Sequence, residues 1–229
     1  MFSERLSQVS ADIAYKLHMP ITTMTTQTQV ALSQARENEE YKEILYSNLE
    51  EFERMAKMIN EMLWLARTDS GLLKPDYEQV DAESELRSLF EYLDAWAEER
   101  TVSLVIEGTC SPVLCDRSLF RRAFSNLLSN ALHHAEGGSN IVVNLRKLEG
   151  YLDISVENSG NVIPAKDIPR LFDRFHRVDP SRHRLDGSGG SGLGLSIVEA
   201  IMSLHGSEIS VTSENNRTRF RVRIPLAPY

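Results

Sequence analysis

The stretch DGSGGSGLGLSIV, Asp186 to Val198, places five glycines directly before an apolar segment with helical spacing. Because glycine lacks a Cβ, such a loop lets the backbone approach a polyphosphate closely and direct free N–H groups toward it. The positive end of the following helix adds to this attraction. A flexible Gly/Ser linker is the alternative, but the apolar helix that begins at once near Leu193 favours a phosphate-binding loop. The five glycines are Gly187, Gly189, Gly190, Gly192 and Gly194.

An upstream segment, FRRAFSNLLSNALHHA, combines an apolar helical face with two asparagines on the other face. Asn126 and Asn130 lie four residues apart and therefore on one side of the helix. An amide oxygen is a suitable ligand for Mg²⁺, which prefers oxygen and keeps most of its waters. His133 and His134, one turn on, are placed to contact phosphate and to stack near a base. The alternative is a set of solvated polar residues on an amphipathic helix.

The second half of the chain alternates helical and strand-like patterns, which predicts an α/β sandwich with one helical layer on one mixed sheet, over residues 81–229. The predicted helices span 82–99, 117–135 and about 193–205, with a short one near 166–171. The predicted strands span 102–107, 140–147, 151–157, 208–213 and 218–224.

The first half predicts two long helices. Apolar residues recur at steps of three and four from Phe2 to Ala31 and again from Tyr41 to Ala66, with a polar break between the two runs. An antiparallel hairpin of two helices cannot bury both apolar stripes, so we expect pairing with a second copy into a four-helix bundle. The sequence thus predicts an α+β protein: a helical hairpin over residues 1–70 that forms a homodimer, a linker over 71–80, and the sandwich.

Composition narrows the function classes. The chain of 229 residues is 41% hydrophobic and 25% charged, with a net charge of −8, so binding to nucleic acid is not expected. No run approaches the roughly 18 apolar residues that span a bilayer, and we expect the chain as given to be cytoplasmic. Cys110 and Cys115, without nearby histidines, are a weak metal signal and are expected to be two reduced thiols near a strand turn.

Four ordered motifs resemble those of sensor histidine kinases. SNLLSNALHHA resembles their N box, VENSGNVIP the G1 box, LFDRFHRVDPSRHR the F box and ATP lid, and GSGLGLSIV the G2 box. In the first half, ADIAYKLHMPITTMTTQTQVALSQA resembles the dimerisation and phosphoacceptor segment. Within the family the chain looks most like heavy-metal sensors of the copper and silver type.

The resemblance implies an ATP-binding domain of the histidine kinase/gyrase/Hsp90 type, with ATP and Mg²⁺ as cofactors. It also implies a phosphorelay to an aspartate of a response regulator, and a full-length protein anchored in the bacterial inner membrane. Asn130 is implied to hold Mg²⁺ and Asn126 to support it. Asn158 stands where the family usually has an aspartate that accepts from the adenine amino group. The remaining implied contacts are Gly160 beneath the base, Phe172 and Phe175 as lid anchors, Arg177 on phosphate, and the Gly187–Gly194 loop, with Leu193, around the triphosphate.

The acceptor motif itself is altered. The family usually reads His-Glu-Leu-Arg-Thr-Pro, and here the six places run from Tyr15 to Pro20 as YKLHMP. Tyr15 holds the acceptor position and Lys16 the general-base position. A phenol keeps its proton near neutral pH, whereas an imidazole offers a nucleophilic nitrogen, and a charged lysine accepts no proton. Transfer at residue 15 is therefore doubtful.

Three alternatives follow. His18 could replace Tyr15 as acceptor, although no acid lies beside it in the sequence. The chain could instead be a non-catalytic ATP-binding dimer that engages a response regulator. A gyrase-type ATPase is disfavoured, because its catalytic glutamate would stand where this chain has Asn126.

Overall fold

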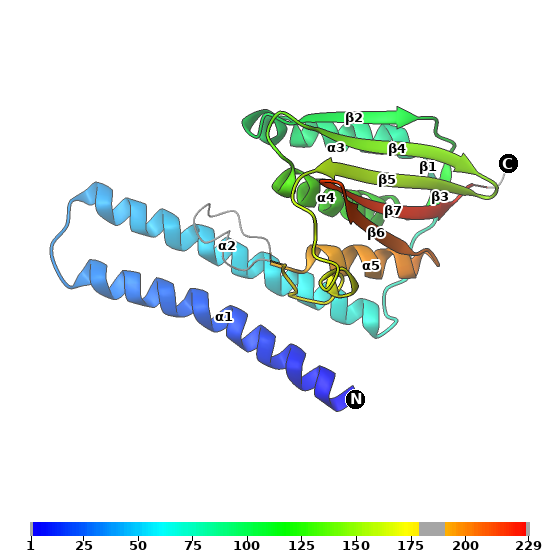
Figure 1. The fold of residues 1–229 in the computed structure, drawn as a ribbon. Helices are drawn as coiled ribbons and strands as arrows, with labels where there is room; N and C mark the ends of the chain where they lie inside the picture. The colour runs from blue at the N-terminus through cyan, green and yellow to red at the C-terminus, as the bar shows by residue number, and fades with distance from the viewer. Residues whose placement is uncertain (1, 179–190, 228–229) are drawn as a thin grey trace. The chain divides into compact units, whose positions relative to one another are not determined.

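The computed structural model describes residues 2–178 and 191–227, and for residues 2–13 it describes the backbone alone. The chain divides into two compact units, residues 1–64 and 65–229. Figure 1 shows the helical hairpin of the first unit and the sheet with its helices in the second.

Helices α1 (Phe2–Leu32) and α2 (Asn38–Asp69) form the hairpin, close to the predicted spans. The buried apolar residues of the described hairpin in the first unit are Met24, Ala31 and Met58. Asn48 donates to the Thr28 hydroxyl at 3.2 Å and links the two helices. Pro20 lies inside α1, where it lacks the N–H that would bond to the carbonyl four residues back.

An apolar stripe remains exposed along α2. Leu45, Leu49, Phe52, Ile59 and Leu63 recur at helical spacing and keep 39–67% of their surface exposed. A continuous exposed stripe of this kind is typical of an interface. Its position agrees with the expectation that the hairpin pairs with a second copy.

The second unit contains a five-stranded sheet in the order β2-β4-β5-β7-β6. Strand β2 pairs parallel with β4, and all other neighbours pair antiparallel, so the sheet is mixed as predicted. The strands are β2 (Ser103–Gly108), β4 (Asn140–Leu148), β5 (Tyr151–Ser159), β6 (Ile209–Glu214) and β7 (Arg217–Pro225).

Three helices cover one face of this sheet: α3 (Ala82–Glu99), α4 (Arg117–His134) and α5 (Gly194–Leu204), with a short 3₁₀ helix η1 at Ile168–Arg170. Apolar side chains alternate along the strands and point at the helices, as a sheet with one buried face requires. Asp81 begins α3 by accepting from the N–H groups of Glu83 and Ser84. The fully buried members of α4 include Phe120, Phe124, Leu127, Leu128 and Leu132.

A two-stranded sheet joins the predicted linker to the domain. Strand β1 (Glu78–Val80) pairs antiparallel with β3 (Val113–Cys115), a pairing that the sequence patterns did not indicate. Residues 78–80 of the 71–80 segment are therefore ordered against the sandwich.

Asp116 connects this small sheet to α4 and α5. Its carboxylate accepts from the N–H groups of Leu119 at 3.0 Å and Asp76 at 2.9 Å, so it caps α4 and binds the segment before β1. Its own N–H donates to His205 Nε2 at 3.0 Å, just after the end of α5. Tyr77 adds a hydroxyl bond to the Leu204 carbonyl at 3.0 Å and an edge contact with the His205 ring.

The other face of the sheet is open and charged. Arg217, Arg219, Arg221 and Arg223 alternate along β7 and project from this face. Arg217 and Arg219 bond to Glu157 of β5, and Arg221 and Arg223 lie within ion-pair distance of Asp153. Two largely buried carboxylates thus hold four arginines.

Cys110 and Cys115 are both free in this structure, and Cys115 is the last residue of β3. Burial raises the pKa of Cys115 to about 12, which keeps it in the unreactive thiol form. Among the residues that the structure describes, none of the helices combines the length and apolar composition needed to cross a bilayer.

The cap at Asp116 gives a stability prediction. Partial burial opposes ionisation of this carboxyl, but the hydrogen bonds from Leu119, Asp76 and Ser118 outweigh it and lower its pKa below the ordinary value. The charged form is thus favoured by folding, and this stabilisation is present above about pH 4 and lost as pH falls through the lowered pKa. We expect Asp116→Ala to lower the free energy of unfolding by about 0.5–2 kcal/mol at pH 7 and by less in acid.

Urea unfolding followed by tryptophan fluorescence, at pH 7 and in acid, measures this difference. Asp116→Asn keeps an accepting oxygen and should lose less than Asp116→Ala. An equal loss for Asp116→Ala at both pH values would contradict the role given to the charge.

Candidate functional site

The polar face of α4 lies against the start of α5. The Asn126 side-chain oxygen lies 3.5 Å from where a Cβ on Gly194 would be, so the backbone at the start of α5 approaches this amide. Asn130 follows one turn later on the same half-exposed face. These are neutral oxygen donors beside a helix N-terminus, and they fit a magnesium ion that is shared with phosphate and water.

The end of β5 is in close contact with the end of α4. At Gly160 a Cβ would lie 2.3 Å from the His134 carbonyl oxygen, so no larger residue fits here. The Gly160 N–H donates to the Asn216 carbonyl at 2.8 Å. Asn158, two residues earlier, is 97% buried beside this contact, with 3% of its surface exposed. A buried amide next to a backbone turn can offer both a donor and an acceptor to a base.

Phe175 is hydrogen-bonded to Gly192 of the glycine loop, and its backbone has an unusual conformation. Its φ is +64°, which is rare for a bulky residue, and its side chain is buried. Its N–H donates to the Gly192 carbonyl at 2.9 Å. Gly192 has φ +76°, and a Cβ there would lie 3.0 Å from the Phe175 Cα. The neighbouring Arg174 bonds to both Asp69 carboxylate oxygens at 2.8 and 2.6 Å.

The other predicted site residues are spread around these contacts. His133 packs edge-on against Trp96, with ring centroids 6.4 Å apart, and His134 is exposed at the end of α4. Leu193 is fully buried as the first residue before α5, and Phe172 and Arg177 are half-buried. Gly187, Gly189 and Gly190 lie outside the described residues.

Within 2–178 and 191–227, no group of three or more His, Cys, Asp or Glu side chains is placed to hold a metal ion. A magnesium ion bound by asparagine oxygen, phosphate and water needs no such group.

The altered acceptor segment lies in α1. Tyr15 is 65% exposed and Met19, one turn later, is 48% exposed, so this side of the helix faces away from α2. Lys16 is half-buried and His18 is exposed. The Thr22 hydroxyl donates to the His18 carbonyl at 2.9 Å, and the same oxygen lies 3.3 Å from His18 Nδ1.

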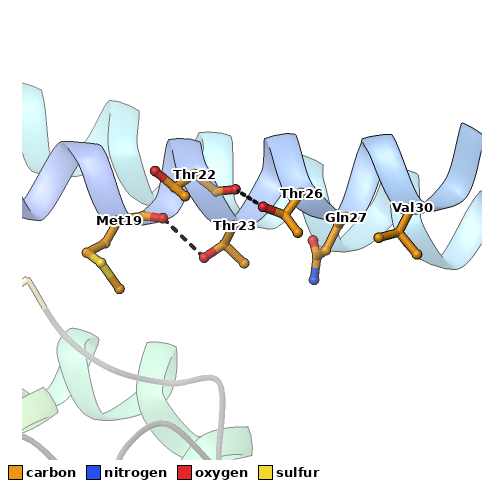
Figure 2. A pocket seen from close by; sticks show the side chains of 6 residues that line it. All are labelled: Met19, Thr22, Thr23, Thr26, Gln27 and Val30. Atoms are coloured by element: carbon orange, nitrogen blue, oxygen red, sulfur yellow. Dashed lines mark hydrogen bonds between the residues drawn. The ribbon is translucent and has the colours of Figure 1, made fainter.

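A run of threonines follows Pro20, and some of them line a shallow groove. Thr22, Thr23, Thr25 and Thr26 each donate to the carbonyl four residues back. Figure 2 shows two of these bonds, from Thr23 to Met19 and from Thr26 to Thr22. The groove is lined by Met19, Thr22, Thr23, Thr26, Gln27 and Val30.

Two family models match the chain in the expected order. Residues 5–71 match the His Kinase A (phospho-acceptor) domain. Residues 115–228 match the histidine kinase-, DNA gyrase B- and HSP90-like ATPase. The chain belongs to the histidine kinase family. The resemblance and the fold class predicted from the sequence are thereby confirmed.

Relatives and solved structures agree with this. The chain is 45% identical over 221 residues to the sensor histidine kinase CusS of Escherichia coli K12, covering 96% of this chain and 46% of CusS. It is 42% identical over 225 residues to the probable sensor kinase SilS of Salmonella typhimurium, covering 96% and 45%. The chain thus spans about half the length of the curated relatives it matches.

The fold resembles the Acinetobacter baumannii histidine kinase AdeS, with a TM-score of 0.78, 19% identity and coverage of 93% of this chain and 98% of AdeS. It also resembles histidine kinase ThkA, solved in complex with response regulator protein TrrA. That likeness has a TM-score of 0.80 and 20% identity, and covers 99% of this chain and 64% of ThkA.

Sequence reasoning missed two parts of this site. The left-handed Phe175 was expected as a lid anchor, but nothing in its local sequence signals the backbone conformation. The Thr22 contact with His18 was also missed, although the spacing of four residues on a helix could have indicated it.

The contact between Gly192 and Phe175 gives a second prediction. Gly192→Ala is expected to lower the free energy of unfolding by more than about 1 kcal/mol, because it adds both left-handed strain and a clash with backbone. Hydrogen exchange at the Phe175 amide should become faster, since the bond to the Gly192 carbonyl is disturbed.

Gly150→Ala is the matched control. Gly150 has φ +78°, and nothing lies within 4 Å of its Cβ position. Gly150→Ala therefore adds left-handed backbone strain without a steric clash. Equal losses of stability in both variants, with unchanged hydrogen exchange at the Phe175 amide, would show that the contact with Phe175 is not what requires glycine at residue 192.

Proposed function

We propose that this chain is the core of a heavy-metal-type sensor histidine kinase that binds ATP and Mg²⁺ through residues 81–229. The observation that carries this proposal is the approach of the Asn126 amide oxygen to the backbone of Gly194. A neutral oxygen ligand, a glycine loop and a helix N-terminus there meet the needs of a metal-bound triphosphate. The match to the histidine kinase-, gyrase B- and HSP90-like ATPase family supports the same ligand.

In this proposal, Asn130 holds Mg²⁺ and Asn126 supports it or the phosphates. Asn158, with Gly160 beneath the base, accepts from the adenine amino group. Mg²⁺ neutralises charge on the phosphates when bound. His133, His134 and Arg177 lie around the phosphates, and Phe172 and Phe175 anchor the segment that covers them.

The helical hairpin is proposed to form the homodimer and to engage a response regulator receiver domain. The exposed stripe on α2 supports dimerisation, because its burial in a four-helix bundle would remove it from water. The structure of ThkA with TrrA supports the regulator partner. The full-length protein is proposed to be anchored in the bacterial inner membrane, as the resemblance to sensor histidine kinases implies.

Residue 15 is proposed not to accept the phosphoryl group. Tyr15 is exposed as an acceptor must be, but a phenol holds its proton and Lys16 provides no base. This loss favours a second candidate function, a dimer that binds ATP, changes arrangement with nucleotide and engages a response regulator without any transfer.

The nucleotide site is tested by removing its metal ligand. Asn130→Ala is expected to weaken ATP binding by about tenfold or more in Mg²⁺, because a charge-assisted contact is lost, and to change little when EDTA removes the metal. Isothermal titration calorimetry measures both affinities.

Asn144→Ala serves as a control, since Asn144 lies exposed on β4 in the sheet. Equal weakening by Asn130→Ala with and without Mg²⁺ would argue against a metal ligand. An unmodified chain that binds no ATP would overturn the proposed function.

The statement on residue 15 is tested with Tyr15→Phe. We expect incubation with γ-labelled ATP to give no acid-stable label on the unmodified chain, and the total label to be the same in Tyr15→Phe. Acid-stable label that disappears in Tyr15→Phe would show phosphotyrosine and contradict the proposal.

A further inference from the structure

Residues 5–71, which match a phospho-acceptor domain, contain a single histidine, His18. It lies on α1 within one turn of Tyr15, and its side chain is exposed. The chain therefore offers one imidazole in the part where this family accepts phosphate. The question is whether the surroundings of His18 make a ring nitrogen nucleophilic.

The Thr22 hydroxyl determines which nitrogen carries the proton. A hydroxyl has one proton to donate, and the 2.9 Å bond from Thr22 to the His18 carbonyl uses it. The same oxygen lies 3.3 Å from His18 Nδ1, and toward this nitrogen it can act only as an acceptor. His18 Nδ1 then donates its N–H. A neutral imidazole carries one ring proton, so Nε2 keeps its lone pair.

The local helix holds this arrangement in place. Thr23, Thr25 and Thr26 likewise donate to the carbonyl four residues back, so Thr22 belongs to a uniform row and its hydroxyl direction is repeated by its neighbours. Pro20 lies between His18 and Thr22 and restricts the backbone there. Nε2 is the ring nitrogen farther from the backbone, and it belongs to an exposed side chain.

We propose that His18 Nε2 accepts the γ-phosphoryl group of ATP, in place of the residue at position 15. This inference rests on the proposed function, because the donor is the ATP bound by the second unit. The Nε2–P bond forms as the bond from the γ-phosphorus to the oxygen of the β-phosphate breaks, and ADP leaves with that electron pair. The phosphorylated imidazolium then loses its Nδ1 proton to water. Thr22 is a positioning residue, which acts through the tautomer of His18.

The experiment incubates the purified full chain with γ-labelled ATP and Mg²⁺ and follows label on the protein, while calorimetry measures ATP binding separately. We expect label that is lost in acid and kept in alkali, and that is absent from His18→Gln. Peptide mapping should place it within residues 5–71. Circular dichroism of His18→Gln checks that α1 still forms.

Thr22→Val and Thr23→Val form a matched pair. Both remove a hydroxyl that bonds to a helix carbonyl, but only Thr22 contacts His18. Thr22→Val is expected to slow labelling by about threefold to tenfold, the effect of one hydrogen bond, while Thr23→Val leaves the rate unchanged. Nitrogen-15 NMR should show the Nδ1–H tautomer of His18 in the unmodified chain and in Thr23→Val, and less of it in Thr22→Val.

The outcomes separate the two proposals. ATP binding without label would overturn the role of His18 and leave the non-catalytic ATP-binding dimer. Label that survives in His18→Gln would also overturn it. Failure to bind ATP would overturn both this inference and the proposed function. An Nε2–H tautomer with equal rates in the two threonine variants would remove Thr22 from the mechanism and, with it, the argument for Nε2.

Discussion

Asp116 is the point on which the geometry of the second unit depends. One carboxylate begins α4 and also binds the N–H of Asp76, and the N–H of the same residue binds His205 after α5. Helix α4 carries the asparagines, and α5 begins at the glycine loop. Joining the start of one helix to the end of the other sets their relative position along their lengths. The approach of Asn126 to Gly194 follows from this positioning and from the packing of both helices on the sheet.

A second constraint is the backbone strain at Phe175, where its N–H bonds to the Gly192 carbonyl. A positive φ at a bulky residue is unfavourable by about 1–3 kcal/mol and persists only where the surroundings impose it. Here burial of the Phe175 ring and its N–H bond to Gly192 provide that compensation. This hydrogen bond joins the segment after η1 to the residues just before α5. The backbone position of Gly192 is therefore connected to the segment that carries Arg174 and Phe175.

Much of this organisation could be predicted from residue patterns. The bounds of α3, α4 and the β4–β5 hairpin follow from hydrophobic periodicity, because this signal is local. The β1–β3 pair could not be predicted, since three-residue strands have no readable period and their partner is distant in sequence. The same reason hides the bond from Asp116 to His205. In the candidate site, the sequence motifs indicate which residues belong to the site, whereas the approach of Asn126 to Gly194 and the φ of Phe175 depend on tertiary contacts.

The arginine row on β7 has a consequence for how the molecule behaves in solution. Four guanidinium groups share the carboxylates of Asp153 and Glu157, which leaves a surplus of two positive charges (4 − 2 = 2) along that row. The chain as a whole has a net charge of −8. The row is therefore locally basic on a chain that is acidic as a whole. Attraction between exposed ionic groups is screened within about 10 Å at 0.1 M salt, so added salt weakens the pairs of this row while the apolar packing on the opposite sheet face is unaffected.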